Sequence, residues 1–172
     1  MEVRVFEGSV LDAPADAIVN AANTELRHGG GVAAAIARAA GPALQRESRA
    51  AGHCPLGQAV ATTAGRLPCR CVLHVPTIDY RNGGRRATDD ELRTGVAAAL
   101  RLARERGCAS VALPILGAGV AGVPADLACR RIAEGLELAL AAGDAPELVL
   151  VCAFSATDRV AAEAVFGPAA PR

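Results

Sequence analysis

Two glycine-rich segments carry the residue types that bind phosphate. The first, Asn20–Gly31, reads NAANTELRHGGG, and the second, Gly117–Gly122, reads GAGVAG. Glycine lets the backbone approach a phosphate closely, and free N–H groups at the start of a helix favour negative charge. Either segment alone fits an ordinary tight turn. Together, and with the asparagines of the first segment, they favour a ligand that contains a diphosphate.

The second segment also fits the dinucleotide-binding pattern G-x-G-x-x-G. In a nicotinamide-binding domain that pattern follows the first strand, and an acidic residue ends the next strand. Here the pattern comes late in the chain, and the apolar run after it ends in Cys152-Ala153-Phe154. A nicotinamide oxidoreductase is therefore a minor alternative.

The remaining histidines and cysteines show no metal-binding pattern. On a strand, Cys69 and Cys71 point to one face and His74 points to the other, so these side chains do not converge on an ion. The chain contains no lysine, which excludes Schiff-base chemistry by a lysine and a P-loop lysine. We expect neither a metal nor a cofactor.

The elements that position these segments follow an α/β pattern, in which short apolar runs alternate with longer stretches of helical period. The clearest helix starts at Thr88, where Glu91 has the spacing of a capping box, and Gly107 ends it. The chain length of 172 residues suits one domain, which we place at residues 1–167, followed by a flexible tail at 168–172. The other predicted elements are strands at 3–10, 17–19, 58–63, 71–75, 110–116 and 147–153 and helices at 32–40, 44–51, 125–142 and 157–166.

Composition and charge limit the partners and the cellular compartment that we expect. The formal net charge is zero, and no basic tail is present, which argues against tight nonspecific binding to nucleic acid or to an acidic membrane. A nucleic acid that carries a small attached group is still an acceptable substrate. The chain does not start with a signal peptide and its cysteines are scattered, so we expect a cytoplasmic protein. We also expect a monomer without membrane contact. Its arginine-only, alanine-rich composition suggests a bacterial genome of high G+C content.

Three runs resemble the signature of the macrodomain family: D-A-I-V-N-A-A-N at 16–23, H-G-G-G-V-A at 28–33 and A-A-G-P at 39–42. Later segments follow in the family's order, so the resemblance covers nearly the whole chain. The run H-G-G-G-V-A is closest to the branch that includes archaeal and viral macrodomains. The resemblance implies a three-layer α/β/α fold with a mixed, roughly six-stranded central sheet and a cleft for ADP-ribose at one sheet edge.

The resemblance also implies which residues form the cleft. Asn23 would bind the hydroxyls of the distal ribose, and His28 would touch this ribose, with a partly exposed loop histidine as its alternative. The hypothesis of hydrolysis adds a water held near Gly30, so Asn23, Gly30 and His28 are the catalytic candidates. Phe154 would stack on adenine, with a place in the core as its alternative. The other implied ligand contacts are Ser9, Val10, Asn20, Gly29, Gly31, Val32, Leu116, Gly117, Ala118, Gly119, Val120 and Ala121.

Three positions depart from the family pattern. Ser9 stands where the family commonly has an aspartate for the adenine amino group, Ala33 replaces an aspartate of one hydrolytic branch, and Ala121 replaces an aromatic residue beside the distal ribose. The favoured function is a hydrolase that removes ADP-ribose from a modified acceptor, either an Asp or Glu ester on a protein or a nucleic acid. The alternatives are a reader that binds ADP-ribose without cleaving it and an O-acetyl-ADP-ribose deacetylase.

Overall fold

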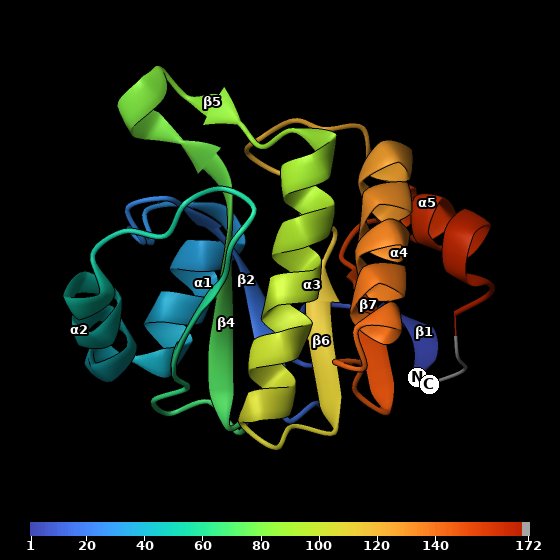
Figure 1. Cartoon of the computed structure of the whole chain (residues 1–172), viewed down its shortest axis with the longest axis horizontal. Coiled ribbons are helices and arrows are strands. Elements are labelled where there is room, and N and C mark those ends of the chain that lie inside the picture. Colours follow the sequence, from blue (N-terminus) through green and yellow to red (C-terminus); the bar gives the residue numbers. More distant parts are fainter. Residues whose placement is uncertain (170–172) are drawn as a thin grey trace.

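The computed structural model, which describes residues 1–169, has one β-sheet at its centre with helices on both faces (Figure 1). Six strands form a path in the order β1-β7-β6-β2-β4-β3, and the short β5 pairs with β4. The first five strands of the path run parallel, whereas β3 and β5 are antiparallel to β4, so the mixed sheet is confirmed. The strands are β1 Glu2–Glu7, β2 Ala17–Asn23, β3 Val60–Thr63, β4 Cys71–Asp79, β5 Arg85–Arg86, β6 Ser110–Pro114 and β7 Leu148–Ala153.

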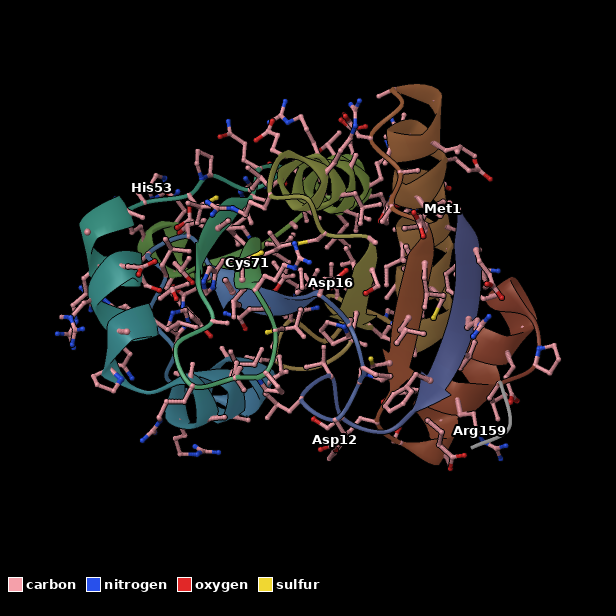
Figure 2. The ribbon with its side chains drawn as sticks, turned by 90° about the horizontal axis from the view of Figure 1, so that it is seen from below. Met1, Asp12, Asp16, His53, Cys71 and Arg159 are labelled. Carbon is pink, nitrogen blue, oxygen red and sulfur yellow. The ribbon has the colours of Figure 1, made fainter. Side chains whose placement is uncertain are left out.

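Helices α1 and α2 cover one face of the sheet, and α3, α4 and α5 cover the other, which confirms the three-layer α/β/α architecture (Figures 1 and 2). Side chains alternate along β2: Ala17 and Val19 pack into the core on the α3–α4 side, and Ile18 packs into the core on the α1 side. By the same alternation, Asn20 belongs to the face of α1 and α2. The helices are α1 Gly31–Ala40, α2 Pro42–Ala51, the 3-10 helix η1 Tyr80–Asn82, α3 Asp89–Glu105, α4 Ala125–Ala141 and α5 Ala156–Phe166.

Local chemistry sets several helix boundaries. The capping box predicted for α3 is present: the Thr88 hydroxyl accepts from the N–H of Glu91, and the Glu91 carboxylate accepts from the N–H of Thr88. A second capping box, not predicted, joins Ser155 and Asp158 at the start of α5. Such boxes satisfy N–H groups that the first turn of a helix leaves without partners.

The fourth strand is longer than the sequence predicts. β4 runs to Asp79 rather than to residue 75, because the polar residues at its end have buried partners: the Thr24 hydroxyl donates to the Asp79 carboxylate at 3.0 Å. Pro76 and Thr77 interrupt the apolar pattern and hide this part of the strand. Residues 77–86, for which the sequence predicts neither strand nor helix, therefore contain the end of β4, η1 and β5.

The amino-terminal edge of the sheet is held together by Asp16, which Figure 2 labels at this edge. Its carboxylate accepts hydrogen bonds from the N–H groups of Ala109 and Ser110 at 2.8 and 3.0 Å, which joins the start of β2 to the start of β6. Within residues 1–169 no helix is long and apolar enough to cross a bilayer. Of the tail expected at 168–172, Ala169 donates its N–H to Glu163 at 3.2 Å, and residues 170–172 lie outside the described part of the chain.

Candidate functional site

The two glycine-rich segments lie beside each other at the carboxyl edge of the parallel strands. The first leads from β2 into α1 and the second leads from β6 to α4, and β2 and β6 are neighbours in the sheet. The segments come close to each other: a Cβ atom added to Gly31 would lie 3.6 Å from Cγ2 of Val120. Segments almost ninety residues apart in the sequence thus form one site.

The start of α1 leaves backbone donors free. Gly30 is the N-cap, no side chain caps the helix, and its first turn contains no acidic residue. The first N–H groups of a helix have no partner within the helix, and the positive end of the helix dipole adds to their attraction for anions. No atom lies within 4 Å of the point where a Cβ atom on Gly29 or Gly30 would stand, so the backbone here is open to a ligand.

In the second glycine-rich loop, Gly117–Gly122, a shorter stretch of backbone is exposed than at the start of α1. Its turns are closed by hydrogen bonds from Val123 N–H to the Gly117 carbonyl and from Gly122 N–H to the Gly119 carbonyl, both at 2.9 Å. Gly119 and Val120 are exposed, while Ala118 is partly buried. Leu116, Gly117 and Ala121 are buried, so the face open to a ligand is centred on Gly119.

The ends of β1 and β7 bring Ser9 and Phe154 to neighbouring positions, since Gly8 N–H donates to the Ala153 carbonyl at 3.0 Å. Phe154 is 80% exposed, which overturns its alternative reading as a core residue and leaves the ring free to stack on a base. The Ser9 hydroxyl accepts from the N–H of Leu11 at 3.2 Å and keeps its own hydrogen to donate.

Asn23 organises the turn after β2. Its Oδ1 atom accepts from the N–H groups of Glu25 and Arg27, both at 3.1 Å, and its Nδ2 atom donates to the Arg27 carbonyl at 2.6 Å. The turn contains Leu26 with a φ of 54°, a conformation that L-residues adopt only when other contacts fix it. Sequence reasoning missed this structural role. One amide hydrogen of Asn23 is left for a ligand.

A buried polar network lies directly behind the glycine run. Asn20 Nδ2 is 3.0 Å from Nδ1 of His74 and 3.3 Å from Nδ1 of His28. The other ring nitrogens reach hydroxyls, with His74 Nε2 2.8 Å from Thr62 Oγ1 and His28 Nε2 2.9 Å from Ser48 Oγ. The sequence predicts that Asn20 contacts the ligand, but its side chain is 0% exposed. That prediction is wrong because Asn20 serves the histidines instead.

This network keeps both imidazole rings neutral. With Nδ2 of Asn20 facing both Nδ1 atoms, the arrangement fits neutral rings that carry their protons on Nε2, each within hydrogen-bond distance of a hydroxyl. Burial lowers the pKa of His28, and burial together with the neighbouring His28 lowers the pKa of His74 to about 3. Both nitrogens of His28 are therefore occupied, and the residue positions the glycine run rather than exchanging protons. Asn20 Oδ1 has no partner among the described residues.

Comparison with known proteins identifies the family. A family model of the macro domain matches residues 19–132, about two thirds of the chain, and the chain belongs to the macrodomain family. An uncharacterized protein of Mycobacterium tuberculosis is 52% identical over 131 residues, which cover 76% of this chain and 35% of that protein. The chain thus spans about a third of the mycobacterial relatives that it matches.

Other relatives match over most of their own length. A protein of Escherichia fergusonii named O-acetyl-ADP-ribose deacetylase is 39% identical over 140 residues, covering 77% of this chain and 78% of that protein. The crystal structure of a Trypanosoma brucei macrodomain in complex with ADP-ribose superposes with a TM-score of 0.81 at 31% identity, covering 95% of this chain and 68% of the other. An Oceanobacillus iheyensis macrodomain with ADP gives a TM-score of 0.80 at 25% identity, covering 93% and 87% of the two chains.

Proposed function

We propose that this chain binds ADP-ribose along the carboxyl edge of its sheet and hydrolyses the bond that joins ADP-ribose to an acceptor. The observation that carries the proposal is the close approach of the two glycine-rich loops beside the uncapped start of α1. A diphosphate between them meets backbone N–H groups. The Trypanosoma brucei relative holds ADP-ribose, and the relative from Escherichia fergusonii is named as a deacetylase of an ADP-ribose ester.

The strand order gives the ligand a direction. The strands β1, β7, β6 and β2 follow one another across the sheet. Adenine lies at the β1–β7 end, against the exposed ring of Phe154 and near Ser9. The diphosphate lies between the loops that follow β6 and β2, and the distal ribose lies at the far end, near Asn23.

Hydrolysis at this site relies on the ligand itself. Ala33 supplies no carboxylate, and both nitrogens of His28 are occupied. In the proposed reaction a water near Gly30 adds across the bond between the distal ribose and the acceptor. A phosphate oxygen of the ligand takes one proton from the water and passes it to the leaving oxygen. Asn23 fixes the ribose, and backbone N–H groups stabilise the developing charge.

The test is a release assay on purified protein. Incubation with a mono-ADP-ribosylated protein and, separately, with O-acetyl-ADP-ribose is followed by chromatography of the free ADP-ribose formed. Release from the modified protein supports the proposal. Release of ADP-ribose from O-acetyl-ADP-ribose but not from the modified protein identifies a deacetylase, which the name of the Escherichia fergusonii relative favours as the second candidate. Calorimetric binding of ADP-ribose with no release from either substrate would identify a reader.

Two variants of Asn23 separate its catalytic role from its structural one. Asn23→Asp keeps an oxygen for the N–H groups of Glu25 and Arg27, whereas Asn23→Ala removes every bond to the turn. If the amide orients the ribose, both variants reduce turnover by roughly tenfold or more while ADP-ribose affinity falls less. A melting temperature near that of the wild type for Asn23→Asp shows that the turn is intact. Equal losses in turnover and affinity would count against the catalytic role.

A further inference from the structure

The short strand β5 carries two neighbouring arginines with different surroundings. Successive side chains of a strand point to opposite faces, so the side chains of Arg85 and Arg86 diverge. Arg85 donates two hydrogen bonds to the Glu91 carboxylate at the start of α3, both at 2.9 Å. Arg86 is exposed, and within residues 1–169 its side chain has no hydrogen bond and no carboxylate in ion-pairing distance. Arg85 therefore fixes β5 to α3, whereas the guanidinium of Arg86 is available to a ligand.

The guanidinium of Arg86 lies beside the second glycine-rich loop. A Cβ atom added to Gly122 would lie 3.4 Å from Nη2 of Arg86 and 3.7 Å from its Cζ and Nη1 atoms. The N–H of Gly122 closes a turn with the carbonyl of Gly119, the residue at the centre of the exposed face of this loop. Arg86 thus lies next to the backbone that we propose for the diphosphate.

The strand order shows from which side Arg86 approaches. β5 pairs with β4, and β2 lies between β4 and β6, the strand whose following loop contains Gly122. The segment from η1 to β5 therefore extends over the carboxyl edge of the sheet toward that loop, and Figure 1 shows β5 next to the loop that precedes α4. In the proposed orientation adenine lies at the β1–β7 end, so Arg86 comes from the side of the distal ribose. The phosphate joined to the distal ribose is the nearer of the two.

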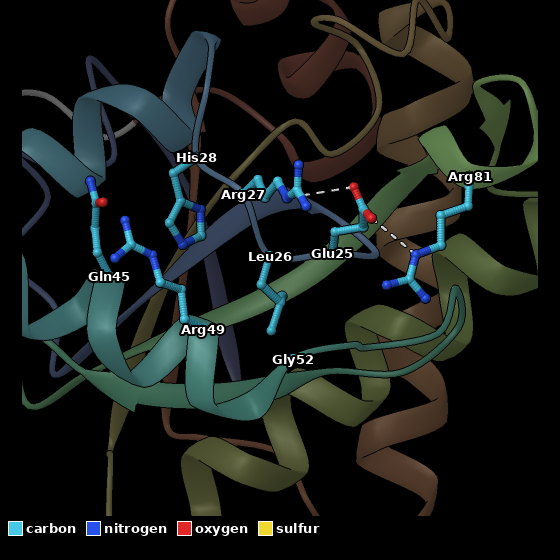
Figure 3. A pocket seen from close by; sticks show the side chains of 8 residues that line it. All are labelled: Glu25, Leu26, Arg27, His28, Gln45, Arg49, Gly52 and Arg81. Carbon is cyan, nitrogen blue, oxygen red and sulfur yellow. Dashed lines mark hydrogen bonds and ion pairs between the residues drawn. The ribbon is translucent and has the colours of Figure 1, made fainter.

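Two other arginines near this end of the cleft share one carboxylate. Glu25 lies 3.0 Å from Nε of Arg81 and 3.7 Å from Nε of Arg27, beside a pocket of about 470 Å³ that Arg49 of α2 also lines (Figure 3). The hydrogen bond from Arg81 lowers the pKa of Glu25, so this carboxyl group is ionised at neutral pH and keeps both partners. The second glycine-rich loop itself contains no charged residue. For an anion at that loop, Arg86 is therefore the neighbouring cation without a carboxylate of its own.

We propose that Arg86 is a ligand-binding residue whose guanidinium donates to an oxygen of the phosphate joined to the distal ribose. The inference rests on the proposed function and adds one side chain to a diphosphate site otherwise made of backbone N–H groups. Hydrogen bonds from a guanidinium to phosphate oxygens are charge-assisted and often paired, so they are stronger than neutral ones. Because Arg86 lies on the side away from adenine, it distinguishes ligands with two phosphates from those with one.

The test is calorimetric titration of the full chain and of three variants with ADP-ribose, ADP and AMP. Arg86→Gln removes the charge, Arg86→Lys keeps the charge without the parallel donors, and Arg85→Gln removes the same charge from the next position of β5. We expect Arg86→Gln to weaken ADP-ribose and ADP roughly tenfold each and AMP less than about twofold. Arg86→Lys should lose less affinity than Arg86→Gln, and Arg85→Gln should weaken each ligand less than about twofold.

Several outcomes would overturn the proposal. Equal losses in Arg85→Gln and Arg86→Gln would mean that only the overall charge of this region matters. A loss for ADP-ribose without a loss for ADP would place Arg86 at the ribose, and an equal loss for AMP would place it at the phosphate beside adenine. Unchanged affinity in Arg86→Gln, with a wild type that binds ADP-ribose, contradicts this inference and leaves the proposed function intact. A wild type that does not bind ADP-ribose contradicts both, so the two failures are distinguishable.

Discussion

The imidazole rings of His28 and His74 are stacked, with their centroids 5.1 Å apart and their planes 25° from parallel. His74 is fully buried on β4, whereas His28 precedes the glycine run of the cleft. The amide of Asn20 bonds both rings, so one polar group joins the core of the sheet to the loop that we propose holds the diphosphate. A proton added to Nδ1 of either ring would face Nδ2 of this amide, which is a donor, unless the amide turned its unpartnered Oδ1 toward the rings.

The first prediction concerns the pH dependence of stability. The folded-state pKa of His74 is about 3, and its ordinary value is 6.5. Between these values the unfolded chain binds a proton that the folded chain does not, so the free energy of unfolding falls as the pH falls. The contribution of one such group between pH 6.5 and pH 5 is about 2 kcal/mol.

Replacing His74 with glutamine removes this titration. We expect the unfolding free energy of His74→Gln, measured by urea denaturation, to be lower than that of the wild type at pH 7.5. The difference should narrow as the pH falls to 5. The carboxyl groups with lowered pKa values, such as Glu91 with a pKa of about 2, act below this range and do not obscure the effect. Parallel pH profiles for the two proteins would contradict the account.

The second prediction concerns the contact between α3 and α4. A Cβ atom on Gly135 would lie 2.6 Å from Cβ of Val96 and 2.7 Å from the carbonyl oxygen of Arg93. Glycine to alanine in an exposed helix stabilises by about 1 kcal/mol, but here the overlap reverses the sign. We expect Gly135→Ala to destabilise by roughly 1–3 kcal/mol in thermal unfolding. Glu137→Ala, at an exposed position of the same helix, is the control and should have little effect.

The glycine-rich loops and the capping box of α3 could be predicted because their chemistry is local in the sequence. The network of Asn20 could not, because it depends on strand register. Asn20 faces His74 only through the pairing of β2 with β4, and Thr62 joins only because β3 pairs antiparallel with β4. From the sequence alone, an asparagine shortly before a glycine run is typical of a ligand contact. The pairing of β2 with β4 is what assigns Asn20 to the buried network instead. The pocket lined by Arg27, Arg49 and Arg81 could not be predicted either, because these side chains come from three separate parts of the sequence.

The third prediction tests the adenine end of the cleft. Phe154 is 80% exposed and packs little against the protein, so Phe154→Ala should leave the melting temperature nearly unchanged. Stacking of a base on an aromatic ring contributes about 1–3 kcal/mol, so ADP-ribose affinity should fall roughly tenfold or more. Val160→Ala, at another exposed apolar position with 65% exposure, should change neither quantity. An unchanged affinity in Phe154→Ala would place the base elsewhere.

The most direct test of the central claim is calorimetric titration with ADP-ribose of the wild type, Gly30→Ser and Gly30→Asp. Gly30 is the N-cap of α1 with extended backbone at a φ of −156°, and no atom lies within 4 Å of its Cβ position, so both residues fit. Serine and aspartate both stabilise a helix start by accepting from its first N–H groups, so both compete with the diphosphate for these donors. Only aspartate also places a negative charge against the diphosphate. We expect Gly30→Ser to bind ADP-ribose and Gly30→Asp to bind it roughly a hundredfold more weakly, with both melting at or above the wild-type temperature. Equal affinity in the two variants, or no binding by the wild type, would show that the start of α1 is not a diphosphate site.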